Sequence, residues 1–170
     1  MKLKSGPKIH IIDKSSSYRK VVAGMIHALG YSSITTSDSC EQFLSGKASP
    51  DIVILDYIMG EKRQTGLSFM QKYSALKFPG TKFIFLSSCT NLDIAVTCIR
   101  SGAFDYIIKS KSGLERLVNR IELLVTTYYV NMRIKKQIRA AIVSLGMIGI
   151  LFVLGILLYY HWNYLSGEMI

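Results

Sequence analysis

The chain has 170 residues, a length that suits one domain with its own hydrophobic core. Its net charge of +10 can indicate nucleic-acid binding, but the lysines and arginines are scattered and the sequence has no helix-turn-helix, zinc-finger or basic-zipper pattern, so we expect no nucleic-acid partner. The cysteines Cys40, Cys89 and Cys98 are odd in number and form no C-x-x-C pair, so neither a disulfide framework nor a thiolate metal site is indicated.

Segments of apolar strand character alternate with segments of helical period, which is typical of a doubly wound α/β domain with a parallel sheet. The predicted strands are residues 8–12, 32–36, 51–56, 82–87 and 104–109. The predicted helices are residues 16–29, 40–44, 66–76, 92–100 and 113 onward.

Two of these helices have predicted caps. Asp38, three residues before Glu41, is the predicted cap of helix 40–44, and Ser112 with Glu115 forms an S-x-x-E capping box before the last helix. No glycine or proline interrupts the last helix from residue 114 to residue 145, so we expect it to continue, straight or softly bent, into the apolar segment that follows.

Residues 141–160 form that apolar segment, and the sequence has no aspartate, glutamate, lysine or arginine between Arg139 and Glu168. A helix of about twenty residues, at about 1.5 Å per residue, spans the hydrocarbon core of a bilayer, which is about 30 Å thick. A long buried core helix is the alternative, but a helix that is apolar all round for this length has no face for water. We therefore predict a transmembrane helix.

Basic residues precede this span, namely Arg133, Lys135, Lys136 and Arg139. After the span, Glu168 is the only charged residue of the sequence. The positive-inside rule therefore places the residues before the span in the cytoplasm. The basic residues also suit contact with anionic lipid. We expect a globular domain in residues 1–128, a basic helical linker in 129–140, the span in 141–160 and a short extracytoplasmic tail in 161–170.

Four predicted strands end on a polar residue, in the order Asp13, Asp56, Ser87 and Lys109. In an open parallel sheet, ligands and chemistry collect just outside the carboxyl ends of the strands. Two carboxylates, a hydroxyl and an ammonium at this edge indicate a site for an anion or a metal ion.

These strand ends, with Tyr106 three residues before Lys109 in the string GAFDYIIKS, resemble the receiver (CheY-like) domain of bacterial two-component response regulators over residues 7–128. The resemblance implies a flavodoxin-like five-stranded parallel sheet of order 2-1-3-4-5. It also implies that Asp56 is the phosphoacceptor, that Ser87 and Lys109 contact the phosphoryl group, and that the Tyr106 ring rotates on activation. The implied partner is a histidine kinase or a phosphotransfer protein, and the implied location is the bacterial inner membrane, crossed once.

In the same resemblance, Asp13 and Asp56 belong to a Mg²⁺ pocket, but Lys14 stands where the family has a second acid. At about 4 Å and an effective dielectric constant near 20, each unit pair of charges is worth about 4 kcal/mol before other costs. We therefore expect weak Mg²⁺ binding unless the Lys14 side chain points into solvent. Gly60 and Ser110 stand where the family usually or often has a proline, and the loop 60–65 departs from the family in length.

Two main functions follow from these residues. In the first, a membrane-anchored receiver is phosphorylated on Asp56, is not itself an enzyme, and signals through protein contacts, at the face of the fourth helix, fifth strand and fifth helix or through the span, to a membrane protein partner. In the second, a pseudo-receiver acts as an interaction module in a membrane complex, with Lys14 paired permanently to Asp56. An α/β domain whose strand-end charges merely lie in solvent is a third alternative. Ala140 and Ser144 form a small-xxx-small pair that suits a homo-oligomer, although the usual glycine content of membrane helices explains such small residues equally well.

Overall fold

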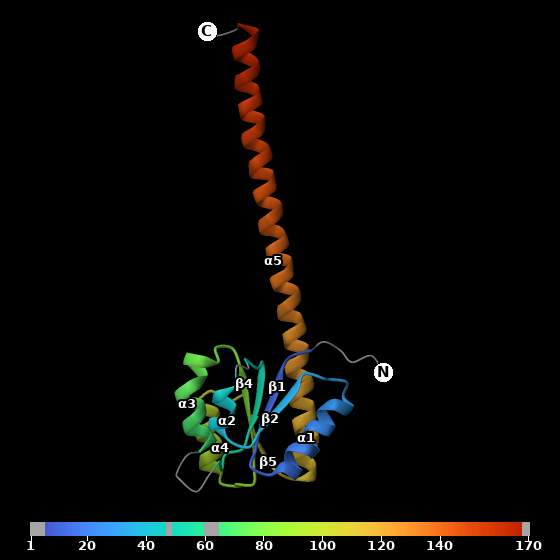
Figure 1. The fold of residues 1–170 in the computed structure, drawn as a ribbon, viewed down its shortest axis with the longest axis vertical. Coiled ribbons are helices and arrows are strands. Elements are labelled where there is room, and N and C mark those ends of the chain that lie inside the picture. Colours follow the sequence, from blue (N-terminus) through green and yellow to red (C-terminus); the bar gives the residue numbers. More distant parts are fainter. Residues whose placement is uncertain (1–5, 47–48, 60–64, 168–170) are drawn as a thin grey trace. The chain divides into compact units, whose positions relative to one another are not determined.

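A computed structural model describes residues 6–46, 49–59 and 65–167 of the chain (Figure 1). The chain divides into two compact units, Met1–Val125 and Thr126–Ile170. The first unit holds the sheet and its helices. The second unit is helical and is described separately below.

Within the described residues, five parallel strands form a single sheet of order β2-β1-β3-β4-β5, which confirms the predicted topology. The strands are β1 (Ile9–Ile12), β2 (Ile34–Ser37), β3 (Ile52–Leu55), β4 (Lys82–Ser87) and β5 (Asp105–Ile108). The helices are α1 (Ser16–Ala28), α2 (Cys40–Ser45), α3 (Gly66–Lys77), α4 (Leu92–Arg100) and α5 (Lys111–Ser166). The central strands β1 and β3 are buried along their whole length, as strands of a parallel sheet covered on both faces must be.

The edge strand β2 begins two residues later than predicted and ends at Ser37. A side chain of the neighbouring strand β1 supports its register. The ring of the buried His10 lies 2.7 Å from the Thr35 hydroxyl and 2.9 Å from the Ser37 hydroxyl. These cross-strand hydrogen bonds explain why a polar sequence pairs with an apolar strand at this edge.

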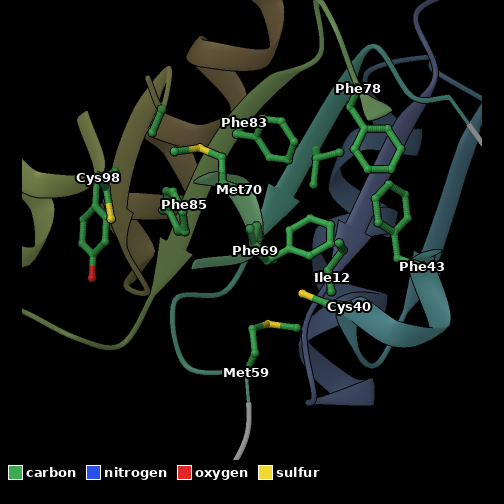
Figure 2. Packing of buried hydrophobic residues seen from close by; sticks show 14 residues of the cluster. Ile12, Cys40, Phe43, Met59, Phe69, Met70, Phe78, Phe83, Phe85 and Cys98 are labelled. Carbon is green, nitrogen blue, oxygen red and sulfur yellow. The ribbon is translucent and has the colours of Figure 1, made fainter. Parts of the chain in front are cut away.

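Each face of the sheet carries its own hydrophobic core, because alternate residues of a strand point to opposite faces. One core contains Val53 and Leu55 of β3 with Phe83 and Phe85 of β4, and α2, α3 and α4 cover it. Figure 2 shows this core, with the rings of Phe43, Phe69 and Phe78 close to one another. The opposite core contains Ile9, Ile11, Ile52, Ile54, Ile84 and Leu86, covered by α1 and by the first turns of α5.

Both predicted helix caps are wrong by one or two residues. Ser39, and not Asp38, caps α2, with its hydroxyl accepting a hydrogen bond from the Gln42 amide at 3.2 Å. The last helix begins at Lys111, so the expected capping box does not start it. Instead, the Ser110 hydroxyl accepts a hydrogen bond from the Gly113 amide at 2.9 Å.

Gly113 explains this earlier start of α5. A Cβ atom at this position would lie 2.0 Å from the carbonyl oxygen of Ile108, so the first turn of the helix comes closer to the end of β5 than any other residue type allows. The close approach brings the Ser110 hydroxyl within reach of the helix amides.

The second unit consists of the remainder of α5 up to Ser166. Among the described residues, α5 is the one helix whose length and composition suit a membrane crossing, with a mean hydropathy of 2.8 in its most apolar window. The predicted linker, span and tail stay predictions. Residues 168–170, at the end of the expected tail, and 60–64, within the expected unusual loop, lie outside the described residues.

Candidate functional site

The structure brings three of the predicted site residues into direct contact. Asp13 follows β1, Asp56 follows β3 and Lys109 follows β5, all at the carboxyl end of the sheet. The Lys109 Nζ atom lies 2.6 Å from Oδ2 of Asp13 and 2.6 Å from Oδ2 of Asp56. The three side chains are mostly withdrawn from water, with exposed fractions of 16 %, 6 % and 9 % for Lys109, Asp13 and Asp56. One ammonium group therefore bridges two buried carboxylates.

Burial alone would lower the pKa of Lys109, but hydrogen bonds and charge interactions with Asp13 and Asp56 outweigh it and raise that pKa above the ordinary lysine value. The second oxygen of each carboxylate accepts a backbone hydrogen bond. The Ser15 amide donates to Asp13 at 2.8 Å, and the Ile58 amide donates to Asp56 at 3.2 Å. Each acid is thus held in position by one backbone amide and by the ammonium of Lys109.

Ser87 lies at the end of β4, between the strands that lead to Asp56 and Lys109. The residue is fully buried, and its hydroxyl accepts a hydrogen bond from the Cys89 amide at 3.3 Å. The structure therefore places Ser87 at the predicted edge of the sheet, where its hydroxyl contacts the loop that follows β4.

Tyr106 is also buried, and its hydroxyl donates a hydrogen bond to the Cys89 carbonyl at 2.9 Å. Its ring stacks on Phe85 with 6.0 Å between the ring centres, and burial raises the pKa of Tyr106 to about 12. The Cys89 peptide is thus held at its amide by Ser87 and at its carbonyl by Tyr106. Sequence reasoning missed Cys89, because a backbone group that accepts or donates leaves no side-chain signal.

Sequence reasoning also missed two residues of α1 beside the charged cluster. The Lys109 Nζ atom lies 4.8 Å from the ring centre of Tyr18, a distance typical of a cation–π contact. The guanidinium of Arg19 donates hydrogen bonds to the carbonyls of Asp13 and Lys14. An aromatic and an arginine within the first turn of the helix after Asp13 are the signal that could have indicated both contacts.

Lys14 is exposed, and it forms no ion pair with Asp56 in the part of the chain that the structure describes. The permanent Lys14–Asp56 pair expected for a pseudo-receiver is therefore wrong, since Lys109 makes that contact. A physical reason is hydration, because a second ammonium buried beside Lys109 would lose its water and face a like charge.

The residues present do not form the donor set of a tight Mg²⁺ site. Mg²⁺ requires near-octahedral oxygen coordination, whereas the described residues offer the carboxylates of Asp13 and Asp56 and contain no group of three or more acidic, histidine or cysteine ligands. The ammonium of Lys109 already contacts both carboxylates. A cation at this position would have to displace or share that contact.

Comparison with known proteins agrees with this arrangement of the strands. The family described as the response regulator receiver domain matches residues 9–122, about two thirds of the chain. The chain therefore belongs to the response regulator receiver domain family. Domains of this family are phosphoacceptor signalling domains of two-component systems, which interact with histidine kinases or phosphotransfer proteins and typically bind Mg²⁺ in their acidic pocket.

Among individual relatives, the probable transcriptional regulator ycf27 of Guillardia theta is 30 % identical over 114 residues, which cover 66 % of this chain and 43 % of that protein. The nitrogen assimilation regulatory protein NtrX of Azorhizobium caulinodans is 27 % identical over 132 residues, covering 77 % of this chain and 28 % of that protein. The chain thus matches less than half the length of these relatives.

Solved structures show the same fold. The BeF3-activated receiver domain of DrrB aligns with a TM-score of 0.62 at 22 % identity, covering 71 % of this chain and 98 % of that one. NtrX from Brucella abortus aligns with a TM-score of 0.66 at 24 % identity, covering 77 % of this chain and 29 % of that one.

Proposed function

We propose that this protein is a membrane-anchored response regulator receiver that is phosphorylated on Asp56 and signals through protein contacts. The observation that carries the proposal is the contact of one lysine with two acids, in which Lys109 holds the carboxylates of Asp13 and Asp56 at 2.6 Å each. The family membership of the chain supplies the reaction class. The partner is then a histidine kinase or a phosphotransfer protein.

The chemistry assigned to Asp56 is nucleophilic attack on phosphorus. A carboxylate oxygen forms the new P–O bond, the P–N bond of a phosphohistidine donor breaks, and the product is an acyl phosphate. Lys109 already contacts Oδ2 of Asp56, so its ammonium stands where it can pair with the negative charge that arrives. The Ile58 amide keeps the other oxygen in place, which leaves one oxygen to react.

The loop after β4 provides a route for the response. Phosphorylation adds nearly two negative charges at the site, and both Ser87 and Tyr106 hold the Cys89 peptide. If the Ser87 hydroxyl moved toward a phosphoryl group, its hydrogen bond with the Cys89 amide would break. The loop that leads into α4 and the Tyr106 ring would then both be free to change position.

A protein partner would find an apolar surface beside that loop. Leu92, Val96 and Ile99 of α4 are exposed at helical spacing, and Ile108 of β5 is 43 % exposed. A cavity of about 490 Å³ lies between α4, β5 and the start of α5, lined by Leu92, Ala95, Ile108 and Arg116 among others. This surface supports the proposal that output passes through the face formed by these three elements.

The membrane part of the proposal depends on the sequence of residues 129–160. Four basic residues precede an uncharged apolar segment of spanning length, and α5 covers both. We assign the receiver domain to the cytoplasmic side of the bacterial inner membrane and residues 161–170 to the other side. The second partner would be a membrane protein.

A second candidate, a pseudo-receiver that works as an interaction module without phosphorylation, is favoured by one observation. The acid that completes the metal pocket in the family is replaced by Lys14, and Lys109 already pairs with both remaining acids. If Mg²⁺ does not bind, Asp56 would stay unphosphorylated. The ion pairs would then fix the domain in one binding conformation.

One experiment distinguishes the two functions. Residues 1–130, which contain the entire sheet unit, are incubated with acetyl phosphate over a range of Mg²⁺ concentrations, and intact mass is measured. We expect an added phosphoryl group on the parent and on Asp93→Asn, an exposed acid that serves as the control, and none on Asp56→Asn. An unmodified parent at the highest Mg²⁺ concentration would favour the pseudo-receiver.

A further inference from the structure

The juxtamembrane helix, residues 126–140, has one face without charge. If residues 127–141 are divided into heptads, three positions recur in each heptad that hold neither a basic nor an acidic residue. The residues at these positions are Thr127, Val130, Asn131, Ile134, Gln137, Ile138 and Ala141. We call this set the uncharged face. The four basic residues of the segment, Arg133, Lys135, Lys136 and Arg139, lie at the other positions, together with Tyr128, Tyr129, Met132 and Ala140.

The uncharged face exposes large apolar side chains to solvent. Val130, Ile134 and Ile138 have exposed fractions of 49 %, 46 % and 53 %. The hydrocarbon core of the bilayer does not reach Val130 or Ile134, which precede the predicted start of the span by about 16 Å and about 10 Å at about 1.5 Å per residue. A helix lying flat on the lipid surface would need a turn before the span, but α5 is one helix through this region and has no glycine or proline between residues 114 and 145.

We propose that the uncharged face is the interface of a parallel homodimer, in which it packs against the same face of a second copy. The proposal rests on the proposed membrane anchoring, since two anchored copies present helices of equal length, equal direction and equal depth. A heptad pattern needs a partner helix that runs alongside it, and a second copy meets this condition residue by residue. The basic residues lie off the face, so pairing does not bring their like charges into the seam.

The composition along the face fits such a pair at both ends. In water, the β-branched residues Val130 and Ile134 suit the close packing of two helices. In the predicted span, the same heptad positions contain the small residues Ala141, Ser144 and Gly155, which allow helix backbones to approach in lipid, and the large residues Leu145, Ile148, Leu151 and Phe152. The uncharged face therefore continues into the predicted span, where small residues lie at three of its seven positions from Ala141 to Gly155.

Disulfide cross-linking of the full chain in its native membrane tests the dimer. Val130→Cys and Ile134→Cys place a thiol on the uncharged face, and Met132→Cys and Lys136→Cys place one off it. After oxidation, the yield of cross-linked dimer should be several-fold higher for Val130→Cys and Ile134→Cys than for Met132→Cys and Lys136→Cys. The parent chain sets the background, because Cys40 and Cys98 are buried and Cys89 is half-buried. Equal yields at the four positions, yields no higher than the parent, or a product that contains a different protein would overturn the homodimer.

A second pair of variants separates packing from chance encounter. In the Val130→Cys background, Ile134→Glu should abolish cross-linking because it brings two carboxylates into the seam, whereas Lys136→Glu should leave the yield unchanged. Equal yields in both variants would overturn the interface.

An alkaline wash of the same membranes tests the anchoring on which the inference rests. A chain that stays with the lipid but does not cross-link overturns the dimer alone. A chain that the wash releases overturns the anchoring, which makes the two failures distinguishable.

Discussion

Removal of the bridging ammonium by Lys109→Met tests the electrostatics of the site. The substitution keeps an unbranched apolar stem but leaves the carboxylates of Asp13 and Asp56, each 2.6 Å from the lost nitrogen, without their cation. Loss of one partner of a buried ion pair typically costs about 3–5 kcal/mol. Because the whole domain is stabilised by about 5–15 kcal/mol, we expect a large fraction of its stability at pH 7 to disappear.

Urea unfolding of residues 1–130 measures this loss, and its dependence on pH identifies the cause. The folded-state pKa of Lys109 is raised, so its contribution is complete below about 10.5 and is lost as the pH rises through the folded-state value. The variant should lack this alkaline decline.

Lys14→Met is the matched control, because Lys14 is an exposed lysine next to Asp13, and its loss should change stability by less than about 0.5 kcal/mol. Replacement of both acids by asparagine in the Lys109→Met background should restore part of the stability. No loss of stability at pH 7, or an alkaline decline in Lys109→Met as large as that of the parent, would refute the reasoning, because the cost would then not exist or would not come from the ammonium.

Three further predictions concern other residues of the sheet unit, and each is measured by unfolding. The buried His10 has a pKa lowered by burial to about 4, so the parent should lose up to about 3 kcal/mol as the pH falls from 6.5 toward 4, and His10→Gln should not. Gly113→Ala should lower the free energy of unfolding by more than about 1 kcal/mol, because its Cβ would lie 2.0 Å from the Ile108 carbonyl oxygen. Gly24→Ala should stabilise the domain, because a Cβ at this helical position meets no atom within 4 Å. Tyr106→Phe should cost about 1 kcal/mol through the lost bond to a loop carbonyl.

The sheet was predictable because its strands carry two signals at once, a buried apolar run and a polar residue at its carboxyl end. Asp13, Asp56 and Lys109 could therefore be assigned to one edge before any coordinates were known, and the structure brings them into contact. The start of α5 was not predictable in the same way. Ser110 and Ser112 are both good caps, and only the approach of Gly113 to the end of β5 selects the first.

The least predictable contacts are those that cross between elements or use the backbone. The cation–π contact between Tyr18 and Lys109 joins α1 to the end of β5, at a sequence separation that no local pattern records. The bonds from Ser87 and Tyr106 to the Cys89 peptide depend on the course of a loop. Sequence identifies which groups are chemically able to act, and tertiary structure decides which of them meet.

The position of Lys14 narrows the choice between the two functions. A lysine that filled the metal position and paired with Asp56 would block phosphorylation by occupancy, but the Lys14 side chain is exposed and Asp56 is paired with Lys109. The remaining argument against phosphorylation is the acid that Lys14 replaces. Its absence weakens the binding of a cation but does not prevent it. A lower affinity for Mg²⁺ raises the Mg²⁺ concentration that the reaction needs. Lys14→Asp should then lower that concentration, and a receiver whose modification ignored this substitution would show that its reaction does not depend on a cation beside Asp13.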